Sequence, residues 1–106
     1  MRKQGREGVI MEYRKIGNTG LDGSIIGLGC EHLDGKPFSQ VKETISAALE
    51  SGINILDVFM PGIEVRQNIA NALGSRRKDV LIQGHIGSAW KDGQYYRTRE
   101  MEYVRP

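Results

Sequence analysis

The sequence contains a single cysteine, Cys30, among its 106 residues. One thiol excludes an internal disulfide, a four-cysteine zinc site and a cysteine-held iron–sulfur cluster. Glu31 and His32 follow it, but a Cys-x-His pair supplies too few ligands for a metal ion, so we expect no metal site. A chain without disulfides is typical of a reducing compartment, and we therefore expect a cytoplasmic protein.

Long apolar runs and a strong net charge are also lacking. No stretch approaches the roughly 18 apolar residues of a membrane span, and the basic start, Met1–Ile10, lacks the apolar segment of a signal peptide. Lys and Arg number 15 and Asp and Glu 13, a net charge of +2 that does not predict nucleic-acid binding. The basic cluster Arg76–Lys78 is more often a solvated helix end than a binding patch. We expect neither a nucleic acid nor a membrane as a partner.

The two ends of the chain differ from its middle. Residues 1–10 are polar and aperiodic, which predicts a disordered lead. Residues 88–106 are polar and aromatic without convincing periodicity, which predicts an irregular tail. Organised sequence spans residues 11–87, and it opens with two short extended segments around Asn18–Gly20, the pattern of a small hairpin.

Short apolar runs then alternate with helical stripes. Buried strands are predicted at residues 24–30, 53–59 and 80–83, because these runs lack the alternation of a half-exposed strand. Between them, apolar residues recur twice at helical spacing, with Gly52 and Gly74 as stops: Val41, Ile45, Ala48 and Leu49, then Val65, Ile69, Ala72 and Leu73. The hairpin followed by β-α-β-α-β predicts an α/β fold with a parallel sheet. This periodicity alone does not separate a doubly wound sheet from a barrel.

Five stretches, in order and with matching gaps, resemble the aldo-keto reductase family. They are similar to its opening hairpin, first strand, "G-I-N-x-x-D" second strand, "x-I-G-x-A-L" helix and third strand: Glu12–Leu21, Ile26–Cys30, Ser51–Asp57, Asn68–Leu73 and Val80–Ile82. The resemblance covers residues 11–87 and implies a partial (β/α)₈ TIM barrel, the N-terminal portion of a fold of about 250 residues. Phe59–Gly62 and Gln83–Gly87 further resemble a divergent bacterial branch of the family.

The family reduces carbonyl compounds with NAD(P)H through a tyrosine, a lysine, an aspartate and a histidine. Asp57 matches the catalytic aspartate at the end of the second strand, although such an aspartate can simply cap the following loop. Residues 58–63 hold no tyrosine, and His85 stands at the lysine position, where near neutral pH it is only partly charged. A plain hydrogen bond from His85 to backbone is an equal alternative. The substrate-orienting histidine follows the fourth strand, beyond this chain.

The resemblance also implies NADP as the cofactor, without separating NADH from NADPH. It places Gly29 and Cys30 at the end of the first strand, near the nicotinamide, although a small buried cysteine is the commoner role. Gly27 and Gly29 form a bare G-x-G that lacks the third glycine of a dinucleotide fingerprint. In the family, loops after later strands hold the cofactor phosphates.

Two functions therefore stay open. The chain is either an N-terminal fragment of an NAD(P)H-dependent carbonyl oxidoreductase, inactive alone and acting on a small carbonyl substrate when complete, or a non-catalytic remnant or assembly module. In both cases a partial barrel leaves strand edges unpaired and apolar surface open. The sequence thus predicts self-association or a partner chain.

Overall fold

The computed structural model describes residues 2–4 and 10–105, with side chains described from Ile10 onward. The helices and strands follow in the order β1 (Arg2–Gln4), β2 (Ile10–Lys15), β3 (Asp22–Ser24), β4 (Leu28–Gly29), α1 (Phe38–Glu50), β5 (Ile55–Val58), α2 (Ile63–Leu73), β6 (Leu81–Gly84), β7 (Ser88–Lys91), β8 (Gln94–Arg97) and α3 (Met101–Val104). Short 3₁₀ turns at Glu31–Leu33 and Gly74–Asp79 complete them. None of the helices in the described ranges is long and apolar enough to cross a membrane.

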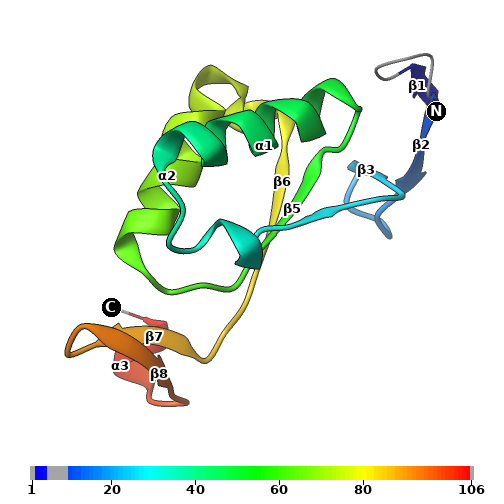
Figure 1. Cartoon of the computed structure of the whole chain (residues 1–106). Coiled ribbons are helices and arrows are strands. Elements are labelled where there is room, and N and C mark those ends of the chain that lie inside the picture. The colour runs from blue at the N-terminus through cyan, green and yellow to red at the C-terminus, as the bar shows by residue number, and fades with distance from the viewer. Residues whose placement is uncertain (1, 5–9, 106) are drawn as a thin grey trace.

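The core unit is a parallel sheet with two helices against one of its faces (Figure 1). The strand order is β4-β5-β6, and α1 and α2 connect them as β-α-β-α-β. The apolar stripes of both helices pack with the central strand into one buried cluster: Cys30, Leu33, Val41, Ile45, Leu56, Met60, Val65, Ile69, Ala72, Leu73 and Val80. The predicted α/β arrangement of these residues is therefore confirmed, since each helical stripe is the buried face of its helix.

The two faces of the central strand have different roles. Leu56 is fully buried among the helix residues, and it pairs in register with Leu28 on one side and Ile82 on the other. Successive side chains of a strand point to opposite faces, so Ile55 and Asp57 lie on the face away from α1 and α2. The sheet thus presents its polar residues on the face that the two helices leave open.

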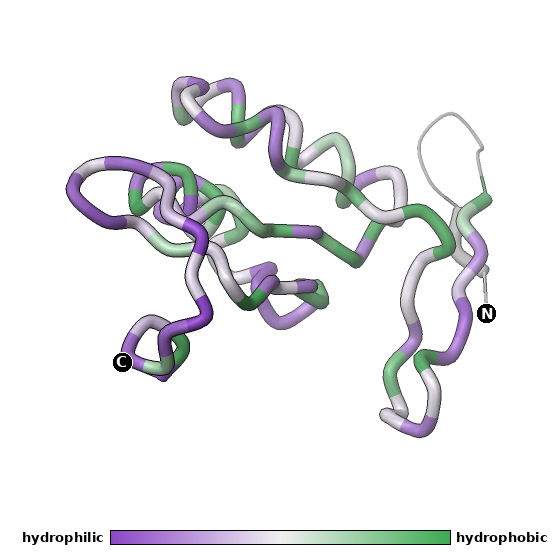
Figure 2. The backbone as a smooth tube through the Cα atoms, turned by 90° about the horizontal axis from the view of Figure 1, so that it is seen from below, coloured by the Kyte–Doolittle hydropathy of each residue, from purple (hydrophilic) through white to green (hydrophobic). Residues whose placement is uncertain are grey.

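The predicted hairpin is present as β2 and β3, which pair antiparallel from Tyr13↔Ser24 to Lys15↔Asp22. Its connection begins at Gly17 and ends before Leu21, with Gly17 and Gly20 both in the left-handed region that glycine tolerates. The hairpin lies on the amino-terminal side of the sheet, and the C-terminal tail lies at the other end of the molecule (Figures 1 and 2).

Asn54, directly before β5, fastens the hairpin to the sheet. Its amide oxygen accepts a hydrogen bond from the Ser24 N–H at 2.7 Å, and its amide nitrogen donates to the Asp22 carbonyl at 2.9 Å. Near by, the Tyr13 hydroxyl donates to the Gly52 carbonyl at 2.6 Å. These bonds join residues about thirty or more positions apart, so they fix where the hairpin stands relative to the sheet.

Parts of both the predicted lead and the predicted tail form short elements in the structure. Residues 2–4 form β1 and pair with β2, while residue 1 and residues 5–9 of the predicted disordered lead lie outside the described residues. The tail, expected to be irregular, forms the hairpin β7–β8 and the short helix α3. The missed signal is Asp92-Gly93: both have positive φ, the geometry of a two-residue hairpin turn.

Loss of the Asn54 amide tests this fastening. Asn54→Ala leaves the Ser24 N–H and the Asp22 carbonyl without their partner in a half-buried position, so we expect the free energy of unfolding to fall by about 1–3 kcal/mol. Urea denaturation followed by circular dichroism measures it. Asn71→Ala on the exposed face of α2 is the matched control and should not destabilise. Equal midpoints for the two variants would contradict the proposed role of Asn54.

Candidate active site at the carboxyl ends of the strands

The polar residues of the sheet converge at the carboxyl ends of its strands. Asp57 in the central strand pairs in register with Gly29 on β4 and with Gln83 on β6. The three residues therefore lie in one row across the sheet, on the face that the helices leave open. Parallel α/β folds bring functional groups together at this edge, because loops from several strands meet there.

Asp57 and His85 form a direct side-chain contact. The distance from His85 Nε2 to Asp57 Oδ1 is 2.6 Å, and both side chains are 41% exposed. An ionised carboxylate only accepts hydrogen bonds, so Nε2 carries the proton and donates to Asp57. The other ring nitrogen, Nδ1, is then free to exchange a proton with a bound group. The two residues that the sequence predicted separately are thus one hydrogen-bonded pair.

Phe59 restrains the imidazole from a second side. Its ring centroid lies 5.9 Å from that of His85, with the planes at 69°, an edge-to-face contact. Residues 58–63 contain no phenol, and the Tyr13 hydroxyl is already engaged at the hairpin end of the sheet. Among these residues, the proton-bearing group in contact with Asp57 is the imidazole of His85.

Of the two residues predicted to lie near the cofactor, Gly29 is at the surface and Cys30 is in the core. Gly29 is exposed next to Asp57, and the Glu31 carboxylate occupies the space beside it, 2.8 Å from where a Cβ on Gly29 would lie. Cys30 is fully buried in the core cluster, where its N–H donates to the Asp57 carbonyl at 3.0 Å. Burial, followed by the charges of Asp57 and Glu31, raises the pKa of Cys30 to about 11. The sequence-based expectation that Cys30 contacts a cofactor disagrees with this burial, because a residue at a strand end can still face the core.

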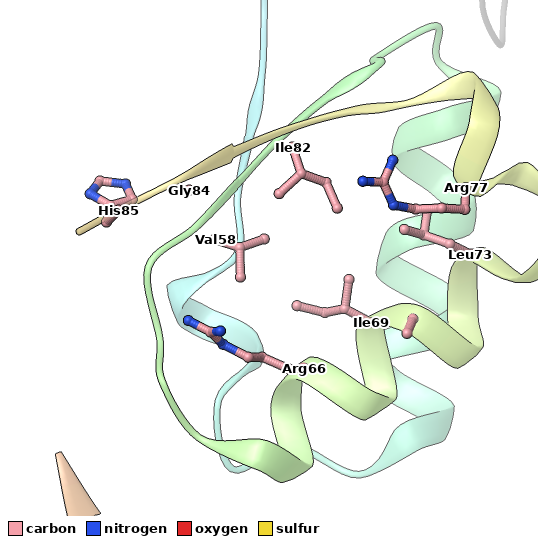
Figure 3. Close-up of a pocket in the computed structure, with 9 residues that line it drawn as sticks. Val58, Arg66, Ile69, Leu73, Arg77, Ile82, Gly84 and His85 are labelled. Carbon is pink, nitrogen blue, oxygen red and sulfur yellow. The ribbon is translucent and has the colours of Figure 1, made fainter. Parts of the chain in front are cut away.

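Two hollows border His85. The first, of about 310 Å³, lies between α2 and β6 and is called here the α2–β6 groove; its apolar residues point into a common space (Figure 3). Its lining comprises Val58, Arg66, Ile69, Ala70, Leu73, Arg77, Ile82, Gly84 and His85. The second, of about 1230 Å³, is called here the tail hollow. It is lined by Phe59, His85, Ile86, Gly87, Ser88, Tyr95, Arg97, Thr98, Arg99, Met101 and Val104.

The tail hollow contains site residues that sequence analysis missed. Arg97 and Arg99 line it together with His85, yet they lie in the segment predicted to be irregular. Only the folding of β7 and β8 brings them to the end of β6, and no spacing rule links residue 85 to residues 97 and 99. Within the described residues, no three His, Cys, Asp or Glu side chains gather as a metal site would require.

Two curated proteins are similar to this chain in sequence. The uncharacterized oxidoreductase YqkF of Bacillus subtilis (strain 168) is 34% identical over 99 residues, which cover 90% of this chain and 32% of that protein. The aldo-keto reductase YhdN of the same organism is 31% identical over 97 residues, or 82% of this chain and 29% of that protein. The chain is a homologue of the aldo-keto reductases. It spans about a third of the length of these relatives.

Solved structures share the fold of this aldo-keto reductase homologue. Two structures of a Pseudomonas aeruginosa protein assigned to the aldo-keto reductases superpose with a TM-score of 0.71 at 24% identity. They cover 88% of this chain, which in turn covers 38% and 37% of theirs. No family model matches the sequence.

The buried thiol generates a pH-dependent prediction. Since the pKa of Cys30 rises from its ordinary 9.0 to about 11 on folding, the unfolded chain ionises first and stability falls as the pH rises from 9 to 11. Cys30→Ala should remove this part of the decline, so its unfolding free energy should fall less steeply than that of the parent. Urea denaturation at several pH values measures both slopes, and parallel curves would contradict an ionisable buried thiol.

Proposed function

We propose that this chain is the portion of an NAD(P)H-dependent carbonyl oxidoreductase that carries the first three strands of a TIM barrel, and that it is inactive alone. The observation that carries the proposal is the Asp57–His85 pair at the carboxyl ends of parallel strands, in a homologue of the aldo-keto reductases. The substrate is a small carbonyl compound. The single cysteine favours a reducing compartment, the cytoplasm.

In this proposal His85 is the proton donor. With both ring nitrogens protonated, Nε2–H remains on Asp57 while Nδ1–H donates to the carbonyl oxygen of the substrate. Asp57 orients the ring and stabilises its charged form, and Phe59 limits its rotation. When bound, NAD(P)H supplies a hydride to the carbonyl carbon. Together, the hydride and the proton convert the carbonyl to an alcohol and return His85 to its neutral form.

The described residues suit one end of the cofactor. Gly29 is exposed beside Asp57 and would hold the nicotinamide side once the flexible Glu31 side chain, which lies against it, has moved. Neither α1, which follows Pro37, nor α2, which follows Gly62, begins with a glycine-rich phosphate loop. The relative YqkF has about twice as much sequence outside the matched region as within it. Polypeptide of that kind would have to bind the phosphates.

A chimera tests the proton donor. Residues 11–87 replace the equivalent segment of the aldo-keto reductase YhdN, and carbonyl-dependent oxidation of NADPH is followed by absorbance. We expect His85→Gln to lower kcat by 10²-fold or more, because glutamine cannot transfer a proton. His32→Gln, a largely exposed histidine of the same segment, is the control and should retain the rate.

Two results would count against this function. A chimera whose rate is unaffected by His85→Gln would exclude His85 as the proton donor. Saturable binding of NADPH to the separate chain, detected by fluorescence at micromolar concentrations, would contradict the proposal that the phosphate-binding part lies elsewhere.

The second candidate function, an assembly module, is favoured by the open edge of the sheet. The sheet ends at β6, and Ile82 on that strand is 39% exposed in the α2–β6 groove. An unpaired strand beside an apolar groove favours association with another chain. We propose that the separate chain self-associates through this edge.

The oligomeric state tests the assembly module. Ile82→Lys places a charge in the groove and on the edge, so we expect it to shift the chain toward monomer. Light scattering coupled to gel filtration measures the mass. Ile63→Lys, at an isoleucine 63% exposed on α2 and outside the groove, is the matched control. A parent chain that is a cooperatively melting monomer would refute self-association.

A further inference from the structure

The tail hollow is a defined place in the fold, because a backbone bond closes it. The Thr98 N–H donates to the Gly87 carbonyl at 3.0 Å, and Ser88 pairs with Arg97 in the β7–β8 ladder. Thr98 is itself buried, and its hydroxyl accepts from the Glu100 N–H at 3.0 Å. These contacts hold the end of β8 against the segment that leaves β6, directly after His85 (Figure 1).

The charge lining the tail hollow is entirely of one sign. Arg97 and Arg99 supply two fixed positive charges and His85 a third when protonated, while no carboxylate belongs to the lining. Among the described residues neither arginine forms an ion pair. A guanidinium recognises a carboxylate through two parallel hydrogen bonds, so two such groups in one hollow form a site for an organic anion.

Three other cations, two of which line the α2–β6 groove, are already engaged by backbone or by an aromatic ring. In the α2–β6 groove, Arg66 Nε donates to the Met60 carbonyl at 2.6 Å and an Arg77 nitrogen donates to the Val80 carbonyl at 3.2 Å. Lys91 lies 4.8 Å from the centre of the Tyr96 ring. Arg97 and Arg99 have no such backbone or ring contact among the described residues, so both guanidinium groups can engage a ligand in the tail hollow.

The remaining lining is apolar and exposed. Ile86 is 85% exposed and Met101 59%, and Phe59, Tyr95 and Val104 continue the same surface. Covering apolar surface is favourable by about 25 cal/mol per Å², and an inorganic anion would leave this surface in water. The lining therefore suits an anion joined to a hydrocarbon body.

We propose that the tail hollow binds an organic carboxylate with an aromatic or aliphatic body, with Arg97 and Arg99 on the carboxylate and Phe59 and Met101 against the body. Because His85 borders the same hollow, the far end of such a ligand lies beside the Asp57–His85 pair. That this ligand is the carbonyl substrate, or its alcohol product, rests on the proposed function. The binding itself requires no turnover and no cofactor.

The test uses the whole chain and two probes with the same hydroxymethylphenyl body, 4-(hydroxymethyl)benzoate and benzyl alcohol, which lacks the carboxylate. We expect the carboxylate to bind at least tenfold more tightly, measured by titration calorimetry, and to shift the imidazole signals of His85 in NMR spectra. R97Q/R99Q should abolish the preference for the carboxylate. R14Q/K15Q, which removes the same charge from the exposed hairpin, should retain it.

Three outcomes would overturn the proposal. The first is equal affinity for the two probes, and the second is a preference for the carboxylate that survives R97Q/R99Q. The third is displacement of the carboxylate by inorganic phosphate at equal concentration, because this would show an anion contact without a site for the body. The circular dichroism of R97Q/R99Q, whose replaced side chains are both exposed, reports that the fold is retained. Failure of the chimera to reduce carbonyl compounds would count against the proposed function and leave this binding result standing.

Discussion

The register of three parallel strands is the constraint on which the rest of the structure depends. Leu28, Leu56 and Ile82 pair across the sheet, and one residue later Gly29, Asp57 and Gln83 do the same. A slip of one residue would exchange the faces, placing Asp57 against the helices and Leu56 in the site. Because Leu56 is fully buried by α1 and α2, hydrophobic packing on one face holds the row that contains Asp57 on the other.

The same register explains why Cys30 and the Asp57–His85 pair, which lie at the same end of the sheet, differ in their chemistry. Cys30 follows Gly29 and turns into the core, where burial keeps its thiol neutral. Asp57 and His85 keep part of their surface in water, so their charges carry a small desolvation cost and can respond to a bound group. The thiol of Cys30 is thus buried and inert, whereas the Asp57–His85 pair at the same end of the sheet is accessible.

Much of this structure follows from the sequence, for identifiable reasons. The stripes at Val41–Leu49 and Val65–Leu73 match one helical face each, and both became the buried faces of α1 and α2. The resemblance to the aldo-keto reductases singled out Asp57 and His85, and the carboxyl ends of neighbouring parallel strands bring their side chains into contact. The burial of Cys30 agrees with the commoner role of a small cysteine, although a strand end does not by itself reveal which face its last residue takes. The β7–β8 hairpin of the tail could have been predicted from the Asp92-Gly93 turn. The hollow lined by Arg97 and Arg99 could not, because it forms only when the folded tail lies beside His85.

The open face of the sheet connects the candidate site with the question of assembly. Near the amino-terminal side this face is covered by the hairpin: a Cβ on Gly23 would lie 2.6 Å from Ile55 Cδ1, so the backbone of β3 packs directly on that residue. Toward the carboxyl ends, the face that carries Asp57 is bordered within the described residues only by the loops and the tail. A proton-donating imidazole works best where water is excluded, and the phosphates of a dinucleotide need further loops. If the proposed function holds, polypeptide that covers the apolar edge would also be in a position to supply those loops.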